Sequence, residues 1–304
     1  MEQTLININD TLKAVLAEKK TRYSGCIHHY TSPEGLEGIL TKKEIWFSNT
    51  KFLNDSSENN YIYSLFPRYC DTYSECLLDQ KYFKIINTIA DQYLQRDYCC
   101  IDGNRLWAEN IFVASFSKDN DNLTLWNYYT KNSEHLGYNV TFQNQPFDIQ
   151  PPYFKYIYGE VIYDNIEQKE LLKKIIIKYN EIYQNNKTLI ENDKNVKDNF
   201  IFQFINIIEL YNIFFKHPKY GNEKEYRWAL YNISNYAGLG PNYRIHKGIF
   251  IPYIKVPFEV DMVVQVGVGP SSNKELLRKS VDLFLSSVGL PHIHSWASKI
   301  PLRY

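Results

Sequence analysis

The sequence CIHHYTSPEGLEGIL, residues 26–40, decides how this chain begins to fold. Its first part, Cys26 to Tyr30, is short and suited to a β-strand. A helix is expected immediately afterwards, because Ser32 can cap its N-terminus, Pro33 suits its first position, and apolar residues then recur at helical spacing. The segment therefore predicts a strand that passes directly into a short amphipathic helix.

Outward from this segment, strands and grouped helices are expected. A short amphipathic helix is predicted within the first 20 residues, and a capping loop at Leu53 to Glu58. The patterns predict strands at 44–49, 112–117, 137–142, 156–163, 225–233, 248–256 and 262–268. They predict helices at 60–100, 123–129, 165–217 (interrupted by a polar loop at 185–198) and 273–288.

This grouping favours an α+β fold over a doubly wound sheet, in which strands and helices would alternate strictly. No repeat or low-complexity stretch divides the chain. We therefore expect a single α+β domain over residues 1–304, with residues 60–100 and 165–217 as helical insertions within it.

The composition is that of a folded chain without a dominant charge. Among 304 residues, 34 Lys and Arg balance 34 Asp and Glu, and 44% are hydrophobic, with 26 Tyr and 17 Phe. The balance argues against a long non-specific nucleic-acid footprint, which needs an excess of basic residues. It also removes a barrier to self-association, which leaves a homodimer open.

Targeting and metal signals are missing from the sequence. No stretch reaches the roughly 18 apolar residues of a membrane span, and the N-terminus lacks a signal-peptide core. The five cysteines form no zinc-type spacing, and the adjacent Cys99 and Cys100 suit a reducing compartment. These features predict a cytoplasmic protein without contact to a membrane and without a metal site.

Common catalytic motifs are also missing. The thirteen glycines form neither a dinucleotide-binding nor a P-loop pattern, and no nucleophile elbow or zinc-binding helix motif occurs. What remains is a dispersed set of polar residues, each of which also has an ordinary structural explanation: a His-Tyr pair on a strand, a Ser-Phe-Ser alternation, and charged residues on a strand face.

Taken in order, these segments resemble a bacterial family numbered 2971 among domains of unknown function, and beyond it the ADP-ribosyltransferase-type folds and DarT-type DNA-modifying toxins. The resemblance extends from about residue 26 to the C-terminus. It is carried by His29-Tyr30-Thr31, Trp46-Phe47-Ser48-Asn49, Leu53-Asn54-Asp55 with Glu58, Ser115-Phe116-Ser117, Leu125-Trp126-Asn127-Tyr128-Tyr129, Glu223-Lys224-Glu225-Tyr226-Arg227 and Gly269-Pro270.

The resemblance implies a split, mixed β-sheet core and an NAD-dependent mono-ADP-ribosyltransferase, with NAD as a substrate. The acceptor would be an intracellular protein or a single-stranded nucleic acid or base, and the protein would act as a bacterial toxin or phage-defence effector. Two alternatives stay open: a non-catalytic module that binds a nucleotide or a nucleic-acid end, and an NAD glycohydrolase.

The same resemblance assigns residues to roles. Glu225 would stabilise the positive charge that develops on the ribose, and Glu223, expected on the same strand face, is the other candidate catalyst. His29 would bind a ribose hydroxyl or the nicotinamide amide. Ser115 or Ser117 would hold the carboxylate in place, and Arg227 would bind pyrophosphate or pair with a glutamate. The remaining candidates for the NAD site are Tyr30, Thr31, Ser48, Asn49 and Tyr128.

A simple criterion separates the alternatives. The transferase requires His29, Ser115 or Ser117, and Glu225 to converge on one cleft. A Glu225 carboxylate locked in a buried salt bridge would instead favour the binding module.

Overall fold

The computed structural model describes residues 23–53, 60–70, 78–94, 111–129, 137–145, 155–231 and 242–301. The helix expected in the first 20 residues and most of the Leu53 to Glu58 loop lie outside this part. The chain forms two compact units: one contains residues 50–111 and 161–220 together with 1–21, and the other contains residues 22–49, 112–160 and 221–304. All the strands that the structure describes belong to the second unit.

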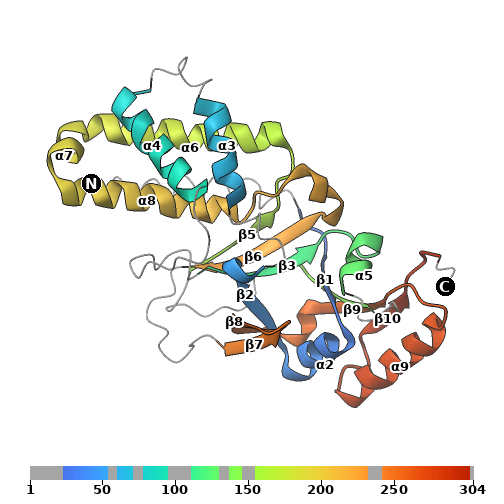
Figure 1. Cartoon of the computed structure of the whole chain (residues 1–304). Coiled ribbons are helices and arrows are strands. Elements are labelled where there is room, and N and C mark those ends of the chain that lie inside the picture. The colour runs from blue at the N-terminus through green and yellow to red at the C-terminus, as the bar shows by residue number, and fades with distance from the viewer. Residues whose placement is uncertain are drawn as a thin grey trace. The chain divides into compact units, whose positions relative to one another are not determined.

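The second unit is built on a mixed ten-stranded sheet (Figure 1). Its main path runs β10-β9-β4-β1-β3-β2-β8-β7, while β6 joins β3 and β5 joins β6. The β9–β10 pair is parallel, and the other described pairs are antiparallel. The strands are β1 (Ile27–Thr31), β2 (Glu44–Asn49), β3 (Phe112–Ser117), β4 (Tyr138–Phe142), β5 (Lys155–Glu160), β6 (Glu225–Tyr231), β7 (Asn242–His246), β8 (Ile249–Pro257), β9 (Val263–Val268) and β10 (His294–Ala297).

Strand β3 is the point at which this sheet branches, because three other strands pair with it. Along its whole length it pairs with β6. Its start also pairs with β2, where Val113 lies opposite Ser48, and its end pairs with β1, where Ser117 lies opposite His28. Strands β1 and β2 are therefore both neighbours of β3, at its two ends.

One face of the sheet carries the core. Strand residues such as Phe47, Phe116 and Trp228 form a buried cluster with apolar side chains of α2 (Pro33–Lys42) and α9 (Lys274–Ser287). Helix α2 begins as expected, since the Ser32 side chain accepts a hydrogen bond from the Gly35 amide. The opposite face contacts α5 (Leu123–Tyr129), whose Leu125 and Trp126 pack on Tyr30 of β1.

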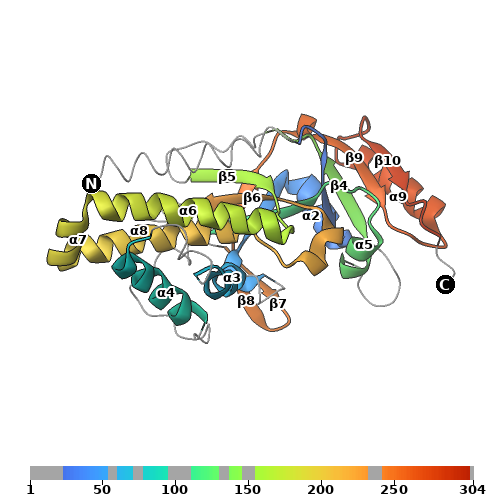
Figure 2. The same ribbon diagram turned by 90° about the horizontal axis from the view of Figure 1, so that it is seen from above.

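The first unit is helical. Helices α6 (Asn165–Asn185) and α8 (Lys194–Asn212) lie side by side, and α7 (Lys187–Asn192) joins them (Figures 1 and 2). The rings of Tyr179 and Phe204 meet between α6 and α8 at 5.0 Å. Helices α3 (Tyr61–Cys70) and α4 (Gln80–Leu94) complete the unit. The two segments predicted as helical insertions thus fold together.

Most expected elements are confirmed, and three differ. The polar stretch 185–198 is mainly helical, because Asp193 caps α8 and Ile190 is buried, so it is not a loop. Strand β5 ends at Glu160, short of the expected residue 163. Strand β7 was not predicted at all. Three short 3-10 helices, η1 (Thr50–Phe52), η5 (Pro218–Glu223) and η6 (Val260–Met262), link the larger elements.

The β7–β8 turn offers a stability test. Lys247 and Gly248 form a two-residue hairpin turn in which both φ angles are positive, 49° and 80°. Lysine tolerates this conformation poorly and asparagine tolerates it well. A Lys247→Asn variant should therefore gain about 0.5–1 kcal/mol of unfolding free energy in urea titrations. Lys279→Asn, on exposed helix α9, should give no gain because asparagine is a weaker helix former.

Candidate functional site

A row of polar residues crosses the face of the sheet opposite the core. Reading across five strands, Gln265 pairs with Thr141, Thr141 with His28, His28 with Ser117, and Ser117 with Glu225. Directly paired residues point to the same face, so these side chains form one line. All but Gln265 are buried. This row, called the polar strip below, is the candidate site.

A second polar row lies beside the strip, two residues along each strand. Ser115 of β3 pairs with Arg227 of β6, and Tyr30 of β1 pairs with Asn139 of β4. Gly159 of β5 lies opposite Arg227 and presents no side chain there. Side chains spaced by two share a face, so this second row enlarges the polar surface of the strip.

Glu225 and Arg227 form an ion pair on this face. A guanidinium nitrogen of Arg227 donates to Oε2 of Glu225 at 2.7 Å. The Arg227 side chain is 3% exposed and that of Glu225 is 10% exposed. Of the two roles expected for Arg227, pairing with a glutamate is the one that the structure shows.

Glu223 does not share a strand face with Glu225, so that expectation was wrong. Glu223 ends the 3-10 helix η5, the strand begins only at Glu225, and Lys224 between them has a φ of 47°. A left-handed residue at this point breaks the two-residue alternation on which the prediction relied. The backbone carbonyl of Glu223 accepts a hydrogen bond from the Ser117 hydroxyl at 2.7 Å.

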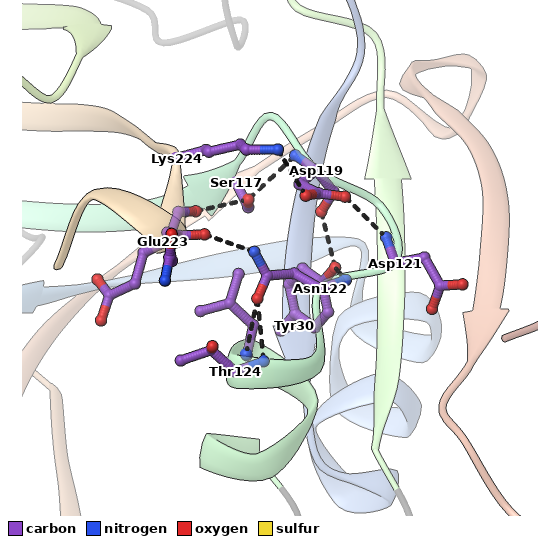
Figure 3. Close-up of polar contacts among 10 residues, drawn as sticks. Tyr30, Ser117, Asp119, Asp121, Asn122, Thr124, Glu223 and Lys224 are labelled. Carbon is purple, nitrogen blue, oxygen red and sulfur yellow. Dashed lines mark hydrogen bonds and ion pairs between the residues drawn. The ribbon is translucent and has the colours of Figure 1, made fainter. Parts of the chain in front are cut away.

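The Ser117 hydroxyl makes hydrogen bonds to backbone groups of Asp119 and Glu223 and not to a carboxylate. Its hydroxyl oxygen also accepts from the Asp119 amide at 3.0 Å, and the Asp119 carboxylate pairs with Lys224 at 2.9 Å (Figure 3). In Figure 3 the Glu223 side chain points away from this network. The expected contact between the Ser117 hydroxyl and a catalytic carboxylate is therefore replaced by contacts to the backbone.

Tyr30 makes hydrogen bonds to the segment between β3 and α5, at Asp119 and Asn122. Its hydroxyl donates to the Asp119 carbonyl at 2.7 Å and accepts from the Asn122 amide at 2.9 Å (Figure 3). Its ring packs on Trp126 at 4.6 Å, and burial raises the pKa of its hydroxyl. Asn122 in turn caps α5 through hydrogen bonds from the amides of Thr124 and Leu125. Tyr30 points away from His29, as expected, and its contacts are structural.

His28 is the residue that the sequence analysis missed. Its Nδ1 lies 2.9 Å from the Thr141 hydroxyl oxygen, and that hydroxyl donates to Oδ1 of Asn139. The Asn139 amide nitrogen donates to the Asn120 carbonyl, which fixes the orientation of the amide. Because the proton of Thr141 is used toward Asn139, its oxygen accepts from His28. The proton of the neutral ring is therefore on Nδ1, and Nε2 is an acceptor.

Burial keeps the His28 ring neutral, as the assignment of a single proton on Nδ1 requires. Desolvation lowers its pKa from 6.5 to about 4, although the negative charge of Asp119 acts in the opposite direction. Strand alternation could have found His28, because it lies one residue from His29 and therefore on the opposite face.

His29 lies on the core side of the sheet. Its ring meets Phe116 edge to face at 5.6 Å, and its Nδ1 donates to the Ser115 carbonyl at 3.0 Å, since a carbonyl can only accept. Desolvation lowers its pKa; the Ser115 contact opposes this shift, and the charge of Arg244 adds to it. His29 thus touches the β3 backbone from the face opposite Glu225.

The other candidates are spread around the sheet. Thr31 packs on α2 so closely that a Cβ at Gly35 would lie 1.9 Å from its hydroxyl oxygen. Ser48 is buried and accepts a hydrogen bond from Arg244 at 2.9 Å. Asn49 is buried at the end of β2, and Tyr128 on α5 is exposed. Of the sequence-derived set, the residues on the polar face are Tyr30, Ser48, Ser115, Ser117, Glu225 and Arg227.

The described residues contain neither a metal-binding cluster nor a membrane-spanning helix. No group of three or more His, Cys, Asp or Glu side chains there could hold a metal ion. Within the same ranges, no helix combines the length and apolar character needed to cross a membrane.

Comparison with known proteins supports the family prediction. Residues 125–228 match the family described as protein of unknown function (DUF2971). This range runs from α5 to β6, and it contains the Leu125 to Tyr129 and Glu223 to Arg227 segments on which the resemblance partly rests. No curated protein and no solved structure matches the chain.

Proposed function

We propose that the polar strip of this chain, whose residues 125–228 match the family described as protein of unknown function (DUF2971), binds NAD and supports transfer of ADP-ribose to an acceptor. The observation that carries the proposal is the position of Glu225. Its carboxylate lies 2.7 Å from Arg227 and in one row with Ser117 and His28. This combines an acidic, a cationic and two hydrogen-bonding side chains on one face.

The chemistry of transfer suits such a face. When the bond between nicotinamide and ribose breaks, its electron pair leaves with nicotinamide and positive charge develops on the ribose. A fixed carboxylate stabilises that charge, most strongly where water is excluded. Glu225 is the group that would act in this way. The acceptor nucleophile then bonds to the ribose carbon and gives up its proton.

Arg227 would bind the pyrophosphate. Its planar guanidinium matches phosphate oxygens as well as carboxylate oxygens. On binding, a pyrophosphate would therefore compete with Glu225 for Arg227 and leave the Glu225 carboxylate nearer to the ribose. The division of the sheet at β3, with β1 and β2 at its two ends, is consistent with an ADP-ribosyltransferase-like split sheet.

The same ion pair favours a second candidate, the non-catalytic module that binds a nucleotide or a nucleic-acid end. The Glu225 carboxylate is buried and paired with Arg227, which is the arrangement expected of that alternative. His29 lies on the core face, so it shares a face with neither Glu225 nor Arg227, and His29 does not meet the convergence required above of the transferase. An NAD glycohydrolase differs from the transferase only in using water as acceptor.

Turnover of labelled NAD tests the proposal. The full chain, mixed with candidate protein and single-stranded DNA or RNA acceptors, should release nicotinamide and transfer label. Glu225→Gln keeps the size of the side chain and removes its charge, so release should fall by on the order of 100-fold. Glu181→Gln, in the exposed Lys178–Glu181 pair of α6, is the matched control and should leave release unchanged.

Other results separate the alternatives. A thermal shift with NAD or ADP-ribose but no nicotinamide release would establish the binding module. Release without label on any macromolecule would establish the glycohydrolase. If neither release nor a thermal shift occurs, NAD is not the ligand and the proposal is wrong.

A further inference from the structure

Among the strands that the structure describes, β7 is the last at its end of the sheet, and its outer edge is unpaired. It pairs with β8 on one side, and in the described part of the chain no strand pairs with its other side. An open edge presents backbone N–H and C=O groups that can pair with another extended segment. Natural edges are often protected by prolines or by inward-pointing charges, but β7 contains no proline.

One face of the β7–β8 hairpin is apolar and exposed. Ile245 pairs with Phe250, and Tyr243 lies two residues before Ile245, so the three side chains share a face. They are 68%, 63% and 61% exposed. On β8 the same face leads to buried Ile254, so the exposed residues continue the core face of the sheet.

The other face is basic. Arg244 and His246 alternate with the apolar residues along β7, and Lys247 follows in the turn. From residue 242 to 257 the sequence holds three Lys and Arg residues and no Asp or Glu, in a chain whose charges balance overall. Lys255 is the third of these, and it pairs with Glu44. The open edge therefore combines exposed apolar side chains with the positive charge of Arg244 and, in the turn, of Lys247.

We propose that this edge docks an extended peptide segment of a partner protein in which apolar and acidic residues alternate. A strand added to β7 sends alternate side chains to the two faces. Its apolar residues lie beside Tyr243 and Ile245, and its carboxylates lie beside Arg244 and His246. The affinity comes from main-chain hydrogen bonds, and the specificity comes from this alternation.

The charge pattern makes a second copy of this chain a poorer occupant. If β7 paired antiparallel with another β7 about Arg244, the two arginines would face each other. If it paired about Ile245, each Arg244 would face a His246, which offers it no opposite charge. Directly opposed like charges weaken a strand pair, whereas carboxylates on a partner would be attracted.

A peptide panel tests this inference independently of NAD. Three fluorescent octapeptides are titrated into the full chain. In the first, Val and Glu alternate; in the second, Val and Lys alternate; the third has the composition of the first, with its Val and Glu residues grouped in two blocks. The Val-Glu alternation should bind about tenfold more tightly than the other two. Ile245→Ser should weaken it about tenfold, since an exposed isoleucine becomes buried on docking. Leu283→Ser, at a 74% exposed position on α9, is the matched control and should bind as the unchanged chain does.

Four results would overturn the inference. The lysine peptide could bind as well as the glutamate peptide, or Ile245→Ser could unfold at the same temperature as the unchanged chain and bind equally well. A fluorescent oligothymidylate could bind in place of the peptides, which would assign the aromatic and basic residues to single-stranded nucleic acid. Finally, a dimer that Ile245→Ser dissociates, without any peptide binding, would make a second copy the occupant.

Discussion

Replacing Arg227 with alanine is expected to cost about 3–5 kcal/mol of unfolding free energy. Both members of the Arg227–Glu225 pair are almost fully removed from water. Taking away the guanidinium removes the Arg227 charge from beside the buried Glu225 carboxylate, so the ion pair no longer offsets the desolvation cost of that carboxylate. Urea titrations followed by circular dichroism measure the change.

A double variant separates the effect of the two charges from that of the surrounding packing. Combining Arg227→Met with Glu225→Leu removes both charges and keeps apolar volume, so the double variant should be more stable than Arg227→Ala. Glu181→Gln removes one partner of an exposed pair and should cost less than about 1 kcal/mol. A loss below 1 kcal/mol for Arg227→Ala would show that water or another group replaces the guanidinium.

Acidification is expected to destabilise the fold through His28. Burial lowers its pKa from 6.5 to about 4, so between these pH values the unfolded chain binds a proton that the folded chain does not. The stability is unaffected by His28 above pH 6.5 and falls as the pH decreases toward 4. The loss at pH 4 amounts to about 3 kcal/mol.

Unfolding free energies at several pH values, with an NMR titration of the imidazole, measure this effect. His28→Gln removes the titrating group. Between pH 4 and 6.5 it should therefore lower the slope of the unfolding free energy against pH by the amount that corresponds to about one bound proton. The lowered pKa of His29 acts with the same sign, so some slope remains in this variant. A His28 that titrates near 6.5 would contradict the desolvation of its ring.

These two experiments also bear on function. Glu225→Gln should lower the unfolding free energy, because it weakens the ion pair with Arg227. If Arg227 can bind a pyrophosphate in place of Glu225, NAD should restore part of that loss. The reason is that a ligand that binds only the folded state stabilises it. If the pair is purely structural, NAD will not affect the stability of either protein. The polar strip therefore links the stability of the sheet to the proposed activity.

Local patterns in the sequence were enough to predict several elements. Ser32, Pro33 and the following apolar spacing predicted α2, and the alternation in Phe112–Ser117 predicted β3 with its observed bounds. Gly289, with a φ of 79°, follows the end of α9 as expected of a helix-terminating glycine. Each of these signals acts over a few residues, so they can be recognised without the rest of the fold.

Signals that depend on distant partners were not predictable in this way. Strand β7 is short, and it pairs with β8 through a turn whose Lys-Gly sequence lacks the usual asparagine or aspartate. The separation of Glu223 from Glu225 depends on Lys224, whose left-handed backbone accompanies a hydrogen bond from the Lys118 amide to its carbonyl. Neither feature has a local signature in the sequence.

The sequence by itself determined that the chain is α+β, where most strands and helices lie, and which polar residue types are present, because these follow from local spacing and composition. Only the tertiary structure decided which of those polar residues meet. Strand pairing placed His28, Ser117 and Glu225 in one row and turned His29 to the core face, and burial joined Glu225 to Arg227. The physical reason is that register between strands distant in sequence sets which side chains share a face, and a shift of one residue reverses it.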